Sequence, residues 1–254
     1  MLKKEFKADA LWVKVYDNRQ SLGEAAGAEA ADYLRGLLSR KEEVVAVFAA
    51  APSQNEFLAA LAAAPGVDWS RVHALHMDEY VGLPEGAPQS FGHFLREAIF
   101  DRVPFGKVDY IGTAGTPEAL MARYDRILAE NPVDVVFMGI GENGHIAFND
   151  PHVADFQDPL RIKRVDLDLT CRTQQVHDGC FPRLEDVPEY ALTLTVPALV
   201  SAARLFCMVP AATKAEAVKA TVLGPVTEKV PATVMRTHPA ATLYVDSDSG
   251  KYLL

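Results

Sequence analysis

Short apolar runs rich in β-branched residues alternate along the chain with longer segments whose apolar residues recur at helical spacing. This alternation is typical of a mostly parallel β-sheet covered by helices. The predicted strands are Leu11–Tyr16, Val44–Ala49, Val72–Met77, Val108–Ile111, Val133–Met138, Arg204–Val209 and Thr242–Val245. The predicted helices lie near residues 21–39, 54–64, 90–99, 117–130 and 214–222.

Four of these helices carry recognisable start signals. A serine or threonine followed three residues later by glutamate matches the capping box, and a threonine before proline offers an N-cap with proline at the first helical position. The matching pairs are Ser21 with Glu24, Ser53 with Glu56, Thr213 with Glu216, and Thr116 with Pro117.

Residues 151–190 break the alternation. Four prolines stand among charged residues here, and proline interrupts regular elements. We interpret this region as an excursion from the main sheet, with a strand near residues 161–167 and flexible loops beside the cleft.

Length and composition fit one globular unit. The 254 residues are 49% apolar and 23% charged, so a large core is available and we expect one α/β domain over residues 1–254. The 25 basic and 34 acidic residues give a net charge of -9, which argues against a nucleic-acid surface and against attraction to anionic membranes. We expect neither an export signal nor a membrane span, because no apolar run has the required length.

Cysteine and histidine usage narrows the chemistry. Cys171, Cys180 and Cys207 form an odd set without a C-x-x-C spacing, so we predict neither a disulfide framework nor a zinc site, and a reducing cytoplasm fits best. There is no H-E-x-x-H pair and no G-x-S-x-G elbow. We therefore expect proton chemistry without a catalytic metal, a cofactor or a covalent intermediate.

Two strand ends carry the functional information, because ligands in an open α/β sheet bind beyond the carboxyl ends of the strands. One strand ends in Asp78 and Glu79, and another runs into a glycine-dense turn that contains His145. An isolated Asp-Glu pair is most often a solvated loop or a helix cap. The imidazole at a second strand end favours a site instead, with Asp78 as a working group and Glu79 in contact with the substrate.

A carboxylate, Asp150, follows His145 by five residues. A carboxylate bonded to one imidazole nitrogen fixes the tautomer and makes the other nitrogen a better base, as proton transfer requires. His145 taken alone could equally be a structural histidine in a turn. The letters GIGENG at 139–144 fit G-x-G-x-x-G, but no helical pattern follows them, so we do not predict dinucleotide binding.

Two basic residues are candidates for binding an anion. Lys214 is predicted in the first turn of a helix capped by Thr213, where free backbone N–H groups and the helix dipole favour negative charge. Arg172 lies in the irregular region and could close over the same ligand. A lysine of this kind is more often a surface residue.

Three segments together resemble the glucosamine-6-phosphate deaminase/isomerase family: LHMDEYVGLPEGAPQSF at 75–91, GIGENGHIAFNDP at 139–151 and KVPATVMRTHPAATLYVD at 229–246. The resemblance implies a single αβα domain with a modified doubly wound, mostly parallel sheet. It also implies a metal-free conversion of glucosamine 6-phosphate to fructose 6-phosphate and ammonia. By this resemblance Asp78 is the base that moves a proton from C2 to C1, and His145 opens the sugar ring. Arg172 and Lys214 match basic residues that hold the 6-phosphate.

The chain departs from the family pattern near the reacting groups. Asn143 stands where many members have a second acid, and an amide can orient a neighbour but cannot donate a proton as a carboxylic acid does. Asp150 replaces the usual glutamate and is one methylene shorter, which can shift a hydrogen bond by about 1 Å. We retain Asn143 and Asp150 as members of the catalytic group.

The largest departure lies in the first loop, where AAAPSQNE at 49–56 replaces a glycine- and threonine-rich phosphate cradle. Pro52 has no N–H, and Glu56 adds negative charge where a phosphate should lie. Ser53 can still offer a hydroxyl to the substrate, while Gln54 would suit a neutral polyol or a carbonyl group. Since two basic partners can outweigh one missing donor, we predict phosphate binding with a weaker dependence on the phosphate.

Two other functions stay open. A 6-phosphogluconolactonase-like hydrolase is the nearest enzyme, although Asn143 and the Phe148–Asn149 continuation speak against it. A non-catalytic sugar-binding protein is the other alternative; regulators of this type usually carry a DNA-binding helix-turn-helix segment, for which we expect no room. The sequence leaves a homo-oligomer open.

Overall fold

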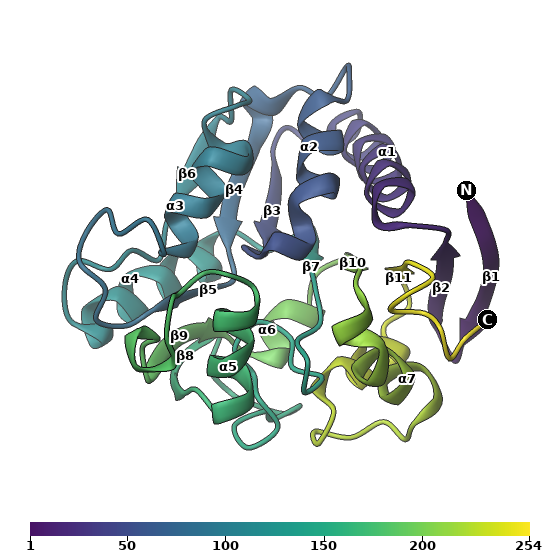
Figure 1. Cartoon of the computed structure of the whole chain (residues 1–254). Coiled ribbons are helices and arrows are strands. Elements are labelled where there is room, and N and C mark those ends of the chain that lie inside the picture. Colours follow the sequence, from purple (N-terminus) through teal and green to yellow (C-terminus); the bar gives the residue numbers. More distant parts are fainter.

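The apolar runs form an eight-stranded sheet in the computed structural model, which describes residues 1–254 (Figure 1). Its strand order is β1-β2-β11-β10-β7-β3-β4-β6, and every neighbouring pair is parallel except β1 with β2. These strands are β1 (Leu2–Ala8), β2 (Leu11–Tyr16), β3 (Val44–Phe48), β4 (Val72–His76), β6 (Lys107–Asp109), β7 (Val135–Met138), β10 (Arg204–Val209) and β11 (Ala241–Val245). The predicted α/β class with a mostly parallel sheet is confirmed.

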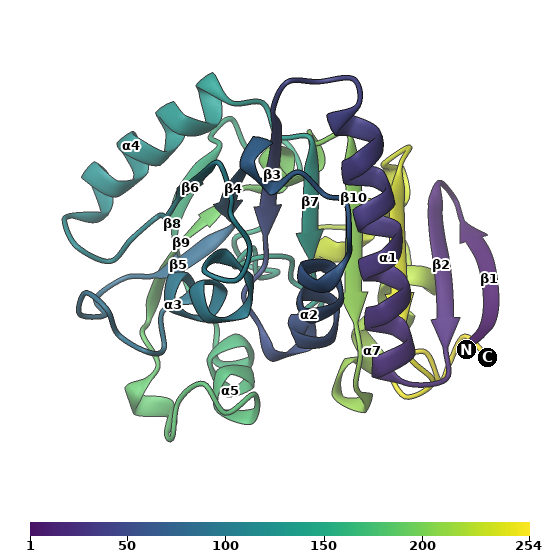
Figure 2. The ribbon, with the colours of Figure 1, turned by 90° about the horizontal axis from the view of Figure 1, so that it is seen from above.

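Helices cover both faces of this sheet. Side chains of a strand alternate between faces, so in β3 Val44, Ala46 and Phe48 pack with α1, α2 and α3, while Val45 and Val47 belong to the core shared with α4, α6 and α7. Figure 2 shows α1, α2 and α3 together on one side of the strands. The helices are α1 (Arg19–Leu38), α2 (Asn55–Ala63), α3 (Phe91–Leu95), α4 (Pro117–Glu130), α5 (Leu169–His177), α6 (Val196–Val200) and α7 (Ala215–Leu223).

A second, smaller sheet was only partly predicted. It is antiparallel, with the order β5-β9-β8, and consists of β5 (Asp78–Tyr80), β8 (Ile162–Asp166) and β9 (Tyr190–Leu194). The strand predicted near 161–167 is β8. The polar pair Asp78–Glu79 therefore does not lie in a loop. It begins strand β5 directly after β4, and the pairing of β5 with β9 connects the segment 151–190 to the main sheet.

Several elements were not predicted from the sequence pattern. Strand β1 is an edge strand with mostly exposed side chains, so it lacks the apolar alternation that marks a half-buried strand. Helix α5 lies inside the segment that was interpreted as irregular, and helix α3 continues as a π-helical turn over Arg96–Phe100. None of the helices combines the length and the apolar character needed to cross a bilayer.

Of the four helix N-caps predicted from sequence motifs, the hydrogen bonds in the structure confirm only one. The Thr116 hydroxyl accepts the N–H of Ala119 at 3.3 Å, as predicted. The Ser21 capping box is wrong, because Asn18 caps α1 by accepting the N–H of Ser21 at 2.8 Å. The predicted caps Ser53 and Thr213 are also wrong, because each lies in a 3₁₀ turn that precedes its helix and makes no capping bond.

The chain reverses direction across the sheet between β3 and β7. From β3 the next strands, β4 and β6, are added on one side, whereas β7, β10 and β11 follow on the other. Such a switch point leaves a crevice at the carboxyl ends of the strands, where open α/β proteins bind ligands. The loops after β3 and β7 both open into this crevice.

Candidate active site

A pocket lies at this switch point. It comprises about 520 Å³ of unfilled space, part of which is open solvent, and it lies where open α/β proteins bind small molecules. Its walls come from the loop after β3, the start of β5, residues 139–148 after β7, helix α5 and Lys214 before α7. Of the eight predicted site residues, the pocket wall includes Ser53, Asp78, His145 and Lys214.

Asp78 presents the unpaired carboxylate of this pocket. The residue is 6% exposed and lies on the pocket wall, and its carboxylate makes no hydrogen bond to another protein group. Burial, and secondly the neighbouring charge of Glu79, raise the pKa of Asp78 well above its ordinary value. A carboxylate with raised pKa and no internal partner is free to accept a proton from a ligand.

Glu79 points to a different environment, as expected for alternate residues of a strand. Its carboxylate accepts the backbone N–H groups of Tyr80, Phe91 and Gly92 at 3.0, 3.0 and 2.9 Å, and so caps the start of α3. Burial raises the pKa of Glu79, although these three donors oppose the shift. Glu79 does not line the pocket with Asp78, and its contact with substrate stays a prediction.

The His145 ring is held against the backbone of Gly141. A Cβ at Gly141 would lie 2.0 Å from Cε1, 2.2 Å from Nε2 and 2.3 Å from Nδ1 of this ring. Only glycine leaves the room that the imidazole occupies. The glycine-dense turn after β7 therefore serves to seat a histidine and is not a dinucleotide-binding loop, in agreement with the absence of a following helix.

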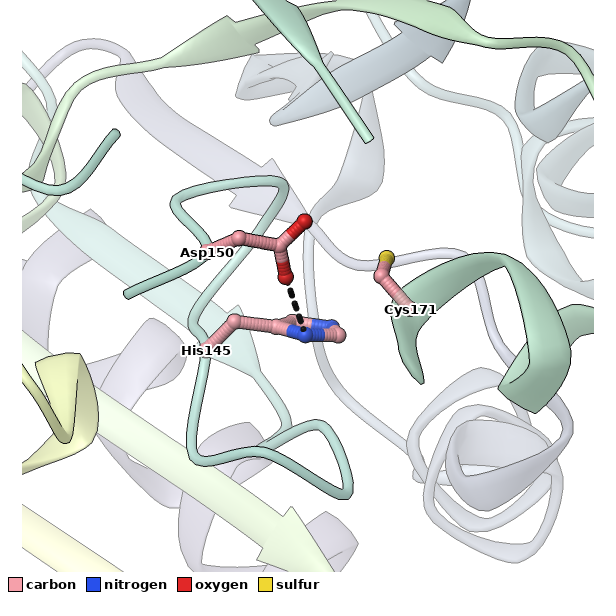
Figure 3. A group of neighbouring side chains, drawn as sticks. All are labelled: His145, Asp150 and Cys171. Carbon is pink, nitrogen blue, oxygen red and sulfur yellow. Dashed lines mark ion pairs between the residues drawn. The ribbon is translucent and has the colours of Figure 1, made fainter. Parts of the chain in front are cut away.

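Acceptors surround one nitrogen of His145. Its Nδ1 lies 3.0 Å from Asp150 Oδ1 (Figure 3). The same nitrogen lies 2.7 Å from Asn143 Oδ1. Both oxygens accept hydrogen bonds, so Nδ1 carries the proton and Nε2 is left to exchange a proton with a ligand. This is the arrangement predicted for a carboxylate-oriented imidazole.

Asp150 is fully buried and satisfied from three sides. Asn143 Nδ2 donates to Asp150 Oδ1 at 2.9 Å and to Asp168 Oδ2 at 3.0 Å, and the N–H of Asp168 donates to Asp150 Oδ2 at 3.2 Å. Burial alone would raise the pKa of Asp150, but the bonds from His145, Asn143 and Asp168 outweigh it and lower the pKa. Asp150 thus stays ionised beside His145.

Cys171 lies beside the same pair (Figure 3). The donor atoms of His145, Asp150 and Cys171 all fall within 4.8 Å of one another, and imidazole, carboxylate and thiolate are ligand types that transition metals accept. Here the ring and the carboxylate are bonded to each other instead. Burial, followed by the charges of Asp150 and Asp168, raises the pKa of Cys171 well above its ordinary value, so the residue is a neutral thiol.

Lys214 is a buried cation on the pocket wall. It is 4% exposed and ends a 3₁₀ turn, Ala212–Lys214, that follows β10. The preceding Ala211 has φ of +85°, a strained value for a residue with a side chain, and its N–H faces the Asp246 carboxylate at 3.2 Å. Burial lowers the pKa of Lys214, while the charges of Asp178 and Glu142 oppose this shift.

The loop after β3 offers amide and hydroxyl groups to the pocket. Gln54 Nε2 donates to the Ser53 hydroxyl and to the Met208 carbonyl, both at 3.1 Å, but Gln54 Oε1 is buried without any partner. The predicted repulsion from Glu56 is wrong, because its carboxylate pairs with the Arg19 guanidinium at 2.7 and 2.8 Å. The loop itself is therefore close to uncharged.

Helix α5 supplies polar residues that the sequence pattern missed. Gln174 Oε1 accepts the N–H of Glu142 at 2.8 Å, and its Nε2 donates to Asp178 at 3.1 Å. Gln175 Oε1 accepts the Tyr80 hydroxyl at 2.6 Å, which leaves its amide nitrogen free to donate. Gln174, Gln175 and Asp178 all line the pocket.

Arg172 is on the same helix but is not part of the pocket wall. Its guanidinium donates to the carbonyls of Leu184 and Val187 at 3.0 and 2.9 Å and lies 3.9 Å from Glu189. It thus stabilises the chain segment that follows α5. In this arrangement its predicted contact with a phosphate receives no support from the geometry.

Sequence comparison places these features among known proteins. Residues 17–244 match the family model described as glucosamine-6-phosphate isomerases/6-phosphogluconolactonase. Two proteins named glucosamine-6-phosphate deaminase, from Bacillus cereus (strain G9842) and Bacillus thuringiensis (strain Al Hakam), are each 40% identical over 185 residues. These alignments cover 72% of this chain and 68% of each relative.

Solved structures share the fold. A monomeric glucosamine-6-phosphate deaminase superimposes with a TM-score of 0.85 at 23% identity, covering 94% of this chain and 98% of that one. A 6-phosphogluconolactonase from Thermotoga maritima gives 0.75 at 19% identity, covering 92% and 98%. The family match over most of the chain and the similarity to the Bacillus proteins show that this chain belongs to the glucosamine-6-phosphate isomerase/6-phosphogluconolactonase family of enzymes.

Proposed function

We propose that the protein isomerises an amino sugar from aldose to ketose with release of ammonia, acting on glucosamine 6-phosphate or a closely related sugar. The observation that carries this proposal is the unpaired carboxylate of Asp78, which shares a pocket with the oriented imidazole of His145. Asp78 is suited to move a proton between two carbons, and His145 is suited to move a proton at an oxygen. The named relatives support the same reaction class.

Asp78 acts as the base of the isomerisation. It removes the proton from C2 of the open-chain sugar and returns it at C1, so that the amine-bearing C2 becomes an imine. Water then hydrolyses the imine to the ketone and releases ammonia, with no net oxidation or reduction. A positioned base with raised pKa contributes about 10²–10⁴-fold to such a transfer.

His145 acts before this step, at the ring oxygen. Because Nδ1–H is held by Asp150 and Asn143, the proton exchange that opens the ring takes place at Nε2. Asn143 cannot supply a proton, so its role is to orient both His145 and Asp150. Lys214 and Ser53 line the same pocket and are the proposed substrate contacts. The three unpaired cysteines suit a cytoplasmic enzyme, and a cytoplasmic location is part of this proposal.

The experiment measures the ammonia and ketose formed from glucosamine, from glucosamine 6-phosphate and from the C2 epimer of each. In D₂O, deuterium exchange at C2 or incorporation at C1 identifies the proton transfer. Asp78→Asn keeps the shape of the side chain and should abolish both signals while ligand binding persists. Activity of Asp78→Asn within about threefold of wild type would remove Asp78 from this role. Hydrolysis of a sugar lactone without any ammonia release would favour the lactonase function of the other family branch.

A further inference from the structure

We propose that His76 is the positioning residue of the base: its imidazole holds the backbone of Asp78, and through the backbone it fixes where the carboxylate lies. This inference rests on the proposed function, in which Asp78 transfers the proton. The carboxylate lies on the pocket wall and makes no hydrogen bond to another protein group, so no bond of its own fixes its direction. Its direction therefore depends on the backbone that carries it.

That backbone lies on the free edge of the smaller sheet. Strand β5 is at the end of the order β5-β9-β8, and Asp78 lies opposite Thr193 of β9. The N–H of Leu194 donates to the carbonyl of Met77 at 2.7 Å, so the bond passes between the residues that flank this pair. In an antiparallel ladder such a pair exchanges no bonds of its own, and its backbone groups point away from each other. The sheet therefore leaves the Asp78 carbonyl without a partner.

His76 supplies the missing bond. It ends β4 two residues before Asp78 and is fully buried. Its Nδ1 lies 2.9 Å from the Asp78 carbonyl oxygen, and its Nε2 lies 2.8 Å from the backbone nitrogen of Ile111. The Ile111 N–H can only donate, so Nε2 is the acceptor and Nδ1 carries the proton that is donated to Asp78. One imidazole thus connects the base to the segment that follows β6.

The imidazole is itself held in one place and one form. The hydroxyl of Tyr124, on α4, accepts the N–H of His76 at 2.9 Å and donates to the His76 carbonyl at 2.8 Å. Burial lowers the pKa of His76 to about 4, so the ring stays neutral at the pH values at which Asp78 is ionised. A proton on Nε2 would face the N–H of Ile111. The donor to Asp78 is for these reasons permanent.

A second histidine makes the same pair of bonds far from the pocket. His238 is also buried; its Nε2 lies 2.8 Å from the Ala202 carbonyl oxygen, and its Nδ1 accepts the N–H of Ala240 at 3.1 Å. It precedes the amino end of β11, whereas the pocket lies at the carboxyl ends of the strands. Both histidines stabilise the fold, but only His76 holds a carbonyl that belongs to the base. His238 is therefore a matched control.

The experiment separates the two bonds of His76 with two variants. Asparagine places an amide nitrogen near the position of Nδ1, so His76→Asn keeps the donor to Asp78 and loses the acceptor for Ile111. Glutamine places its amide near Nε2, so His76→Gln keeps the acceptor and loses the donor. We expect His76→Gln to lower kcat by about 10²-fold while KM stays within about threefold, because a shift of about 1 Å misaligns the base. His76→Asn should keep kcat within about threefold of wild type.

Stability serves as the second readout. Each His76 variant leaves one buried backbone group unpaired, so both should unfold at a lower temperature than wild type. His238→Asn and His238→Gln should do the same and leave kcat unchanged. A folded His76→Gln with wild-type kcat, or with a loss in KM alone, overturns the inference. An equal loss of kcat in both His76 variants also overturns it, because the shape of the imidazole would then matter and not its bond to Asp78.

A titration separates this inference from the proposed function. If the wild-type enzyme turns over no amino sugar, the proposed function fails, but the carbon-13 NMR signal of the Asp78 carboxyl, identified by its loss in Asp78→Asn, still reports on its surroundings. Burial raises the pKa of Asp78, and a released strand edge would let water reach the carboxylate. We expect the raised pKa in wild type and His76→Asn and a lower pKa in His76→Gln. The same pKa in all three proteins overturns the inference.

Discussion

The imidazole of His145 occupies the space above Gly141 in which any other residue would place its Cβ. The contact is between a functional side chain and the backbone of its own turn, four residues earlier. It makes the position of the ring depend on the absence of a single carbon atom.

Gly141→Ala should therefore displace the ring and lower kcat by about 10²-fold or more, because a displacement of about 1 Å is enough to lose alignment. Gly36→Ala is the matched control: a Cβ there meets nothing within 4 Å, and the residue lies in α1. That control should keep full activity and gain about 0.4–1 kcal/mol of stability. Full activity of Gly141→Ala would show that His145 need not lie where the structure places it.

Asp150→Asn should lower kcat by about 10²–10⁴-fold and change KM little, because an amide no longer favours the Nδ1–H tautomer of His145. The measurement is steady-state ammonia release, with circular dichroism to establish that the variant is folded. Loss of activity through KM alone would mean that Asp150 supports binding and not the chemistry of His145.

The pH dependence of turnover should report Asp78. Burial raises the pKa of this carboxyl, and only its ionised form can accept a proton. As the pH falls through the raised pKa, kcat/KM should decline, so the acidic limb should lie well above the ordinary range of an aspartate. A profile that stays flat down to about pH 4 would contradict the raised pKa or the role as base.

The raised pKa of Asp78 also affects stability: it makes the folded protein less stable as the pH rises. Between the ordinary and the raised pKa of Asp78, the unfolded chain releases its proton before the folded one, so rising pH favours unfolding. Asp78→Asn removes this effect. At pH 8 the variant should be more stable than wild type by about 1 kcal/mol or more, and near pH 3 the difference should vanish. Thermal unfolding at both pH values tests the sign, and a variant less stable at pH 8 would refute it.

Arg172 should prove important for stability more than for binding. Arg172→Ala removes the donors to Leu184 and Val187 and should cost about 1–3 kcal/mol in urea denaturation. Arg126→Ala, at an exposed position on α4, should stay within about 0.5 kcal/mol of wild type. An unchanged stability with KM raised tenfold for a phosphorylated sugar would return Arg172 to the phosphate-binding role that its family resemblance implied.

The reacting groups could be predicted from sequence because their positions follow from local pattern. Asp78 and His145 both come after apolar strands, and strand ends converge at one edge of a parallel sheet. The partners of His145, Asn143 and Asp150, lie on the same short segment as the histidine, so chain proximity was sufficient to suggest the His145–Asp150 pair.

The α5 wall could not be predicted in this way. Leu169–His177 is mostly polar and has no strong apolar stripe, so neither its helical state nor its inward face appears in the pattern. Gln175 is placed by the Tyr80 hydroxyl, a partner 95 residues away in sequence. Arg172 was chosen for its charge, which says nothing about the carbonyls that it contacts in the fold.

Helix α5 and the proton-transfer groups share one set of hydrogen bonds. Asp168 caps the helix by accepting the N–H of Cys171 at 2.6 Å, and it also bonds to Asn143 and Asp150. A displacement of the helix start would break the bonds between Asp168 and both residues that orient His145. The start of α5 and the orientation of His145 are for this reason coupled through one side chain, Asp168, so a substitution that moves the helix start also reaches the proton-transfer group.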